Sequence, residues 1–392
     1  MIPVAEALKC IEDTTAVLKI ITIPIAGATG YVLAEDVVSI INMPPFNQSA
    51  MDGYALHLHN HTQYTIIDEV KAGDAHQPVL QKGEAVRIFT GAPVPETANA
   101  VVMQEKVVAS NTVIDLQTSV KPHDNIRPLG EQTQLGHVAL TKGTTLTPAA
   151  IGYLTTLGFT KVKVYQHPKI AIVVTGNELA KPGTPLTYGK IYESNSFMLA
   201  SAVESLGYAK PNVYTVKDNY NDTKNLLEQT INNNDLVLIT GGISVGDYDF
   251  VGKALLELNT QQVFYKVKQK PGKPLFFGTN HHTKIFALPG NPAAALSCFY
   301  IYVNTALKRM SGLENFTLQT LQLKSATHFV KKGDRTQFLK AIYQNDRVKI
   351  LEGQSSAMLQ TFALANALVK MDENCSEIHI GDTVEVIPLA KL

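Results

Sequence analysis

The chain has 392 residues, and its 45% hydrophobic content is enough for roughly two to four domains with separate cores. Its 34 Lys and Arg residues balance 34 Asp and Glu residues, so it lacks the basic excess of proteins that coat nucleic acid or anionic membranes. Cys10, Cys298 and Cys375 are far apart in sequence, which argues against a disulfide framework and favours a reducing compartment.

The first segment of the chain predicts an amphipathic helix, because Val4, Leu8 and Ile11 recur at helical spacing. It lacks the basic head and uninterrupted apolar stretch of a signal peptide. The most apolar segment, residues 285–307, is broken by a Pro-Gly-Asn-Pro turn and does not resemble a membrane span. We therefore expect a soluble, cytoplasmic protein with no nucleic-acid or membrane partner.

Residues 1–165 predict an N-terminal domain in which short β-strands follow the leading helix. Gly, Pro and Asn separate β-like runs at 65–70, 85–90, 100–108 and 112–119. This pattern indicates an inserted β subdomain at about 46–137. Residues 147–157, with Pro148 near the start and Gly158 after the end, predict a short helix.

Residues 166–312 alternate between strand and helix patterns, which is typical of a mostly parallel sheet covered by helices. The predicted strands are 170–175, 212–216, 236–240, 263–267, 274–277 and 284–288. The predicted helices are 195–206, 222–231, 249–258 and 292–310. The fold class is therefore α/β and multidomain.

Residues 313–392 return to β patterns at 317–323, 337–343, 347–351, 367–371 and 383–388. A small C-terminal β-barrel or sandwich is the simplest architecture for strands of this length and spacing.

A glycine-rich turn follows the predicted strand 236–240. Without Cβ atoms, Gly241, Gly242 and Gly246 allow the backbone beside Ser244 to approach an anion, and a helix begins at Asp249. Asp249 could cap that helix or hold a divalent cation beside a phosphate. A plain structural turn is the alternative.

A second turn is rich in lysine. Lys266, Lys268, Lys270 and Lys273 lie within eight positions, around a Pro-Gly turn. Compact ammonium charges suit phosphate or another oxyanion. A solvated loop is the alternative interpretation.

A third turn, Leu-Pro-Gly-Asn-Pro at 288–292, leads into the long predicted helix. Asn291 is a natural N-cap and Pro292 a natural first helical residue. The turn either faces an anion or only begins the helix.

Three carboxylates follow predicted strands of the same sheet: Glu178, Asp218 and Asp249. Because the carboxyl ends of parallel strands meet at one edge, these groups could converge to hold Mg²⁺ beside a phosphate. Each could equally be a surface or capping residue.

Two segments of the N-terminal domain, 46–55 and 87–95, are dense in turn formers and are candidate binding loops or ordinary connections. His57, His59 and His61 alternate, so on a strand they would share a face. That face could hold Zn²⁺ or Ni²⁺, but no fourth ligand is evident, and we assign them no role.

Together these motifs resemble the molybdopterin molybdenumtransferase family, which includes the bacterial MoeA proteins and the plant Cnx and gephyrin E domains. The resembling pieces span most of the chain and are specific in combination. They are SAMDGYA at 49–55, RIFTGAPVP at 87–95, NIRPLGE at 125–131, TGNEL at 175–179, IYESN at 191–195, ITGGISVGDYD at 239–249, KPGKP at 270–274 and ALPGNPAAAL at 287–296.

The resemblance implies a cytosolic homodimer of elongated subunits whose central domain has the molybdopterin-adenylyltransferase fold. It implies that the substrates are molybdate and adenylylated molybdopterin, that AMP is released, and that Mg²⁺ takes part. The active site would lie between the central domain of one subunit and the N-terminal domain of the other. Molybdopterin adenylyltransferase and apo-molybdoenzymes are the implied partners.

The resemblance also assigns roles to residues. Asp52 and Thr90 would enter the cleft from the N-terminal domain. Acidic residues would position Mg²⁺ and the pyrophosphate: Glu178, Asp218 and Asp249. Lysines would offset substrate charge: Lys266, Lys270 and Lys273. The remaining pocket residues would be Gly241, Gly242, Ser244, Gly246, Pro289, Asn291 and Pro292, with Arg335 and Ser356 from the C-terminal domain.

The chain departs from the family pattern at two positions. Asn177 and Gln132 stand where the family commonly has Asp, so each removes a negative charge. The sequence does not predict the effect on Mg²⁺, the choice between molybdate and tungstate, or the recipient enzymes.

Two other functions remain open. Adenylyltransferases of the same pathway also pair a TGG loop with an Asp, but the flanking domains and the pairing of KPGKP with ALPGNP favour the molybdenumtransferase reaction. A scaffold role, as in the gephyrin branch, is less favoured because the chain has no long linker or appended domain.

Overall fold

The computed structural model describes residues 1–242 and 250–389. Contacts between residues divide the chain into two compact units. The larger unit comprises residues 1–22, 30–34 and 163–392, and the smaller unit comprises residues 23–29 and 35–162.

A six-stranded sheet forms the centre of the larger unit. Its order is β16 (Asn212–Val216), β13 (Ile170–Thr175), β17 (Leu236–Thr240), β21 (Thr283–Leu288), β20 (Phe276–Asn280) and β18 (Gln261–Tyr265). The first four strands are parallel and the last two pair antiparallel. Every residue of β13, β17 and β21 is buried, as continuous apolar runs predict for strands covered on both faces. The prediction of a mostly parallel sheet is confirmed.

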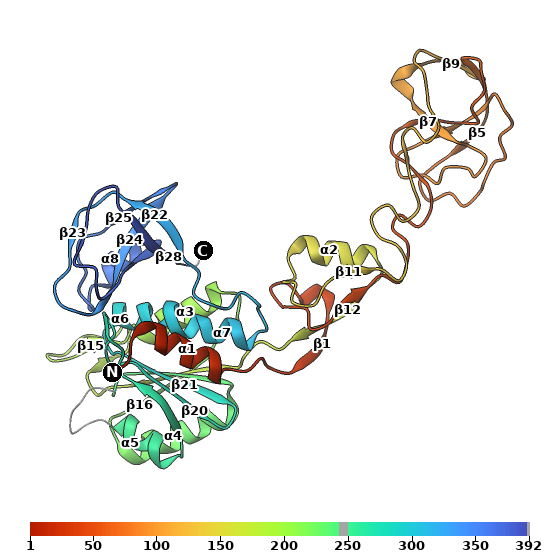
Figure 1. The fold of residues 1–392 in the computed structure, drawn as a ribbon. Coiled ribbons are helices and arrows are strands. Elements are labelled where there is room, and N and C mark those ends of the chain that lie inside the picture. The colour runs from red at the N-terminus through yellow and green to blue at the C-terminus, as the bar shows by residue number, and fades with distance from the viewer. Residues whose placement is uncertain (243–249, 390–392) are drawn as a thin grey trace. The chain divides into compact units, whose positions relative to one another are not determined.

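Helices cover both faces of this sheet (Figure 1). On one face lie α4 (Tyr220–Asn233) and α5 (Phe250–Glu257), packed on Val173 and its neighbours. On the other lie α1 (Val4–Thr14), α3 (Asn195–Ser205), α6 (Pro292–Cys298) and α7 (Asn304–Met310). A five-residue π-helical segment, η3 (Phe299–Val303), joins α6 to α7, so the helix predicted at 292–310 is continuous but not uniformly α-helical.

The C-terminal part of the larger unit is a closed barrel. Its strands are β22 (Leu321–Ser325), β24 (Thr336–Gln344), β25 (Arg347–Ile350), β26 (Ala367–Met371) and β28 (Thr383–Pro388). The pairing of β24 with β26 closes the ring, which confirms the barrel alternative of the sequence analysis. Outside the barrel are α8 (Leu359–Leu364) and a two-stranded ribbon of β23 (Phe329–Val330) and β27 (Glu377–Ile378).

The smaller unit contains a mixed six-stranded sheet. Its order is β7 (Ala100–Met103), β4 (Gly53–Leu56), β6 (Glu84–Ile88), β5 (Gln63–Val70), β9 (Val113–Leu116) and β8 (Val107–Ala109). The helix α2 (Pro148–Thr156) begins at Thr147, whose side chain accepts a hydrogen bond from Ala150 N at 3.2 Å.

Short elements complete the chain. They are β1 (Ile20–Pro24), η1 (Ile25–Gly27), β2 (Val37–Val38), β3 (Gln48–Ser49), η2 (Gln104–Lys106), β10 (Ile126–Arg127), β11 (Val138–Leu140), β12 (Lys161–Tyr165), β14 (Leu179–Ala180), β15 (Ile191–Tyr192) and β19 (Gln269–Lys270).

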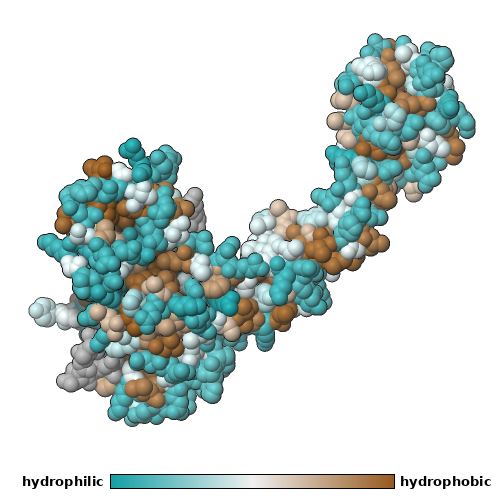
Figure 2. Space-filling model, in the orientation of Figure 1, coloured by the Kyte–Doolittle hydropathy of each residue, from teal (hydrophilic) through white to brown (hydrophobic). Residues whose placement is uncertain are grey.

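The surface is predominantly hydrophilic, with smaller apolar patches between polar regions on the face drawn in Figure 2. Among the helices of residues 1–242 and 250–389, none combines the length and apolar character that a bilayer crossing requires.

The buried side chain of Gln269 joins the central sheet region to the barrel. Its strand, β19, pairs in parallel with β24. Gln269 Nε2 donates to the carbonyl oxygens of Pro271 and Gly272, at 3.0 and 3.2 Å, and Gln269 Oε1 accepts a hydrogen bond from the Tyr302 hydroxyl. These bonds fix the path of the lysine-rich turn from inside the protein.

Gln269→Leu should therefore destabilise the larger unit by on the order of 3 kcal/mol, because it leaves two carbonyls and a hydroxyl without their buried partner. The melting temperature of the full chain measures this loss. Gln319→Leu, at an exposed glutamine, is the matched control. Equal melting temperatures for the two variants would contradict the role of Gln269.

Candidate active site

A cavity of about 1060 Å³ opens in the larger unit at the carboxyl ends of β13 and β17. In the sheet, β16 lies on one side of β13 and β17 lies on the other, so the order of the strands reverses at β13. In open α/β sheets such a reversal of strand order leaves a crevice in which ligands bind. The cavity therefore lies where the topology of the sheet predicts a site.

The structure gathers at this cavity most of the described residues that the sequence singled out in the larger unit. Those that line it are Glu178, Gly241, Gly242, Lys270, Lys273, Pro289, Asn291, Pro292, Arg335 and Ser356. Two others, Asp218 and Lys266, are not among its lining residues. Three predicted positions, Ser244, Gly246 and Asp249, fall outside the described residues.

Two glycines allow the end of β17 to approach the end of β13. Gly241 and Gly242 have φ values of 93° and 64°, in the left-handed region. A Cβ atom on Gly241 would lie 2.3 Å from the backbone oxygen of Thr175, and one on Gly242 would lie 2.8 Å from Thr175 Oγ1. Side chains are thus excluded at both positions by contact as well as by backbone conformation.

Positive charge enters the cavity from two parts of the larger unit. Lys270 is the last residue of β19, Lys273 lies in the turn that follows it, and Arg335 directly precedes β24. Arg335 Nη1 donates to the backbone oxygen of Gln269 at 3.3 Å, which holds the guanidinium beside the lysine-rich turn. Three cationic side chains at one cavity suit a multiply charged oxyanion.

Asn291 and Pro292 occupy the N-cap and first helical positions of α6, as predicted, but the Asn291 side chain does not cap the helix. Its Nδ2 donates instead to Ser356 Oγ at 3.0 Å. The backbone of α6 also contacts this loop, since Ala294 N donates to the Ser356 oxygen at 3.3 Å. The 288–292 turn is therefore bonded to a loop of the C-terminal barrel.

Asp218 is bonded to Asn177, one of the two positions that depart from the family pattern. Asp218 Oδ2 accepts from Asn177 N at 3.0 Å, and Asn177 Oδ1 accepts from Asp218 N at 3.2 Å. An aspartate at 177 could provide the same acceptor, so the asparagine preserves this link and removes one negative charge.

Lys266 directs its ammonium toward the ring of Tyr265, 4.7 Å from the centroid.

In the smaller unit, Asp52 and Thr90 lie together although 38 residues separate them. Asp52 Oδ1 accepts from Thr90 N at 2.7 Å and from Thr90 Oγ1 at 2.8 Å. The backbone and hydroxyl donors of Thr90 lower the pKa of the Asp52 carboxyl. Asp52 directly precedes β4, and Thr90 follows β6, its antiparallel neighbour.

Asn195 and Thr175 were not assigned roles from the sequence, although both lie within resembling motifs and line the cavity. Asn195 Nδ2 donates to Thr240 Oγ1 at 2.7 Å and to the Gly290 oxygen at 2.8 Å, bridging two of the turns. Asn195 Oδ1 and Thr175 Oγ1 are buried and have no hydrogen-bond partner within the described parts of the chain. Buried polar atoms of this kind are suited to receive a ligand.

No sequence pattern indicates a role for Lys340, yet this residue holds in place a loop that lines the cavity. This residue of β24 is only 3% exposed, and burial lowers the pKa of its ammonium. Its Nζ donates to the oxygens of Gly353, Ser355 and Met358, at 2.8, 3.1 and 3.0 Å. Lys340 thereby holds the loop that carries Ser356.

Three family models together match most of the chain. The MoeA N-terminal region (domain I and II) matches residues 2–158, a probable molybdopterin binding domain matches residues 171–309, and the MoeA C-terminal region (domain IV) matches residues 322–389.

Individual relatives agree with these matches. The molybdopterin molybdenumtransferase of Haemophilus influenzae is 34% identical over 375 residues, covering 93% of each chain. The protein of the same name from Staphylococcus aureus strain Mu50 is 30% identical over 398 residues, covering 98% of this chain and 95% of its own. The crystal structure of the molybdopterin biosynthesis moeA protein from Pyrococcus horikoshii superposes with a TM-score of 0.83 at 31% identity, covering 99% of this chain and 100% of that protein.

Lys340→Met should loosen the 353–358 loop, because it removes three hydrogen bonds while keeping side-chain length. Unsatisfied buried carbonyls cost about 1–3 kcal/mol, so amide hydrogen exchange in this loop should accelerate roughly tenfold. Lys349→Met, at an exposed lysine of β25, is the control. Unchanged exchange in Lys340→Met would show that the loop does not depend on this ammonium.

Asp52→Asn should lower the melting temperature of the smaller unit at neutral pH. Because the pKa of Asp52 is lowered on folding, its carboxylate stabilises the fold above the ordinary carboxyl pKa, and this contribution is lost as pH falls through the folded value. The difference from wild type should therefore shrink in acid. Asp115→Asn, at an exposed carboxylate of β9, controls for loss of one charge. A difference that is constant with pH would contradict the Thr90 contact as its cause.

Proposed function

The chain belongs to the molybdopterin molybdenumtransferase family, and we propose that it inserts molybdate into adenylylated molybdopterin, releasing AMP, in molybdenum cofactor biosynthesis. The observation that carries this proposal is the cavity at the carboxyl ends of β13 and β17. Its lining combines two glycine turns with the cations Lys270, Lys273 and Arg335. Molybdate and a phosphoanhydride are multiply charged oxyanions that such a lining suits.

The donor atoms at the cavity also fit Mg²⁺, which prefers oxygen ligands. Glu178 provides a carboxylate, and the buried oxygens Asn195 Oδ1 and Thr175 Oγ1 have no partner in the described part of the chain. We propose that Glu178, with Asp218 and Asp249, holds the ion. When bound, Mg²⁺ would offset the charge of the phosphate oxygens.

The chain's own residues would act by binding and orientation. Two Mo–S bonds would form as one molybdate oxygen leaves as water with the two thiol protons, and a water molecule would cleave the phosphoanhydride to release AMP. No nucleophilic side chain is therefore required. Cys298 does not fill such a role, because burial raises the pKa of its thiol to about 12. Lys270, Lys273 and Arg335 would hold the oxyanions in place, and positioning would account for most of the rate gain.

Asp52 and Thr90 extend the proposal to a homodimer. Their hydrogen-bonded pair is exposed, and it presents an ionised carboxylate at the start of β4. We propose that this pair enters the active site of a second subunit in the cytoplasm. Molybdopterin adenylyltransferase would supply the substrate, and apo-molybdoenzymes would receive the product.

The assay combines the purified chain, adenylylated molybdopterin, Mg²⁺ and molybdate, and follows AMP release and reconstitution of an apo-molybdoenzyme. Both signals together support the proposal. AMP transfer from ATP to molybdopterin, without molybdate-dependent AMP release, would favour the adenylyltransferase alternative instead.

Lys270→Ala should reduce molybdate-dependent AMP release about 100-fold or more, the usual effect of removing one preorganised charge from an active site. Lys349→Ala, which removes an exposed lysine from β25, should retain wild-type turnover. Wild-type turnover in a folded Lys270→Ala protein would overturn the assignment of the cavity.

A further inference from the structure

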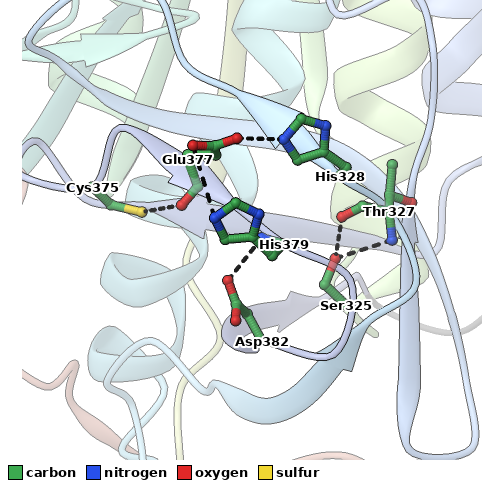
Figure 3. Close-up of polar contacts among 7 residues, drawn as sticks. All are labelled: Ser325, Thr327, His328, Cys375, Glu377, His379 and Asp382. Carbon is green, nitrogen blue, oxygen red and sulfur yellow. Dashed lines mark hydrogen bonds and ion pairs between the residues drawn. The ribbon is translucent and has the colours of Figure 1, made fainter.

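A second cluster of chemically active side chains lies outside the active-site cavity, on the ribbon of β23 and β27. It consists of His328, Glu377 and His379, and one ligand atom of each lies within 4.8 Å of the others (Figure 3). Among the described residues, this is the one group of three or more His, Cys, Asp or Glu side chains that meets this criterion. None of the three lines the cavity described above.

The register of the ribbon explains why these residues converge. Phe329 pairs with Ile378 and Val330 with Glu377, so the next pair outward places His328 opposite His379. Opposed residues of an antiparallel pair share a face, and Glu377 shares it too because it lies two positions from His379. The two imidazole rings are stacked, with centroids 5.5 Å apart and planes at 14°.

The backbone on both sides of the cluster is held by hydrogen bonds. Lys331 N donates to the Ser376 oxygen at 2.8 Å, which extends the ribbon. Beyond His379, the chain turns back because His379 N donates to Asp382 Oδ2 at 2.7 Å. On the other strand, Ser325 Oγ bonds the backbone of Thr327, directly before His328. The cluster is therefore built on a fixed support (Figure 3).

The geometry of the side-chain atoms is close to that of a metal site. His328 Nε2 lies 2.5 Å from Glu377 Oε1, and His379 Nε2 lies 3.8 Å from Glu377 Oε2. Zinc bonds to nitrogen and oxygen of about 2.0–2.1 Å place tetrahedral ligand atoms roughly 3.3 Å apart. This value falls between the two observed separations, which involve the two different oxygens of Glu377. Side-chain rotations that replace the His328–Glu377 hydrogen bond would accommodate an ion.

The chemistry of the donors selects the class of ion. Two imidazoles with one carboxylate favour Zn²⁺ and neighbouring first-row ions over Mg²⁺ or Ca²⁺, which prefer all-oxygen sites. The side chains are 52%, 40% and 65% exposed for His328, Glu377 and His379, so water can reach a fourth coordination position. Three protein ligands with an open position is a recurrent zinc arrangement.

We propose that His328, Glu377 and His379 form a binding site for one divalent transition-metal ion, with Zn²⁺ as its representative. The ion would link the start of β23 to the end of β27 and so cross-link the ribbon. This site is separate from the proposed Mg²⁺ site, and its existence does not depend on the proposed function.

The test is calorimetric titration of the untagged, full-length chain with ZnCl₂ in the presence of excess Mg²⁺, which occupies oxygen sites. We expect one Zn²⁺ per chain for wild type, and affinity at least tenfold weaker for His379→Ala and for Glu377→Gln. The double variant His281→Ala/His282→Ala, in the exposed turn between β20 and β21, should bind Zn²⁺ like wild type.

The melting temperatures of the same variants verify that they are folded, a readout that does not depend on the proposed function. The proposal is overturned if wild type binds no Zn²⁺ at micromolar concentration. It is equally overturned if the His379 and Glu377 variants retain wild-type affinity, or if the His281/His282 variant alone loses binding.

Discussion

The proposed active site depends on the reversal of strand order at β13, which has β16 on one side and the parallel strand β17 on the other. This reversal leaves a crevice where two buried strands end, and the cavity lies in that crevice. Gly241 and Gly242 allow the chain after β17 to pass close to Thr175, because any side chain there would collide with that residue. Asn195 then ties the end of β17 to the 288–292 turn.

The C-terminal barrel completes one wall of this crevice. The pairing of β19 with β24 brings Arg335 beside the lysine-rich turn, and the buried ammonium of Lys340 shapes the loop that carries Ser356. The side chain of Gln269 holds the lysine-rich turn in place by donating hydrogen bonds to two backbone carbonyls of that turn. Residues that are more than 60 positions apart in the sequence therefore line a single cavity. The side chains of Gln269 and Lys340, which hold the lining segments in place, are both buried and polar.

Much of this arrangement is predictable from the sequence, because its signals are local. Continuous apolar runs ending in glycine turns predict buried parallel strands with binding loops at one edge, and the cavity lies at that edge. The lining residues Glu178, Lys270 and Asn291 were found in this way. The barrel was also predictable in outline, since its strands are short and regularly spaced.

The remaining features depend on pairings that a single sequence does not reveal. Lys340 interrupts the apolar run of β24 from Phe338 to Ile342, and nothing in that run predicts that the 353–358 loop folds over its ammonium. His57 and His59 alternate as on a strand, yet neither lies in one, and their rings bond the backbone carbonyls of Leu80 and Gln63. Conversely, His328 and Glu377 are 49 residues apart, and only the register of β23 with β27 brings them together.

The proposed reaction requires that the crevice at the ends of β13 and β17 binds molybdate as a substrate. Anomalous X-ray scattering at the molybdenum edge, from crystals of the full chain soaked in molybdate, would locate the bound anion. We expect a molybdenum peak inside the cavity, within contact distance of Lys270 or Lys273. A peak confined to other surfaces, with the cavity empty at saturating molybdate, would contradict this expectation.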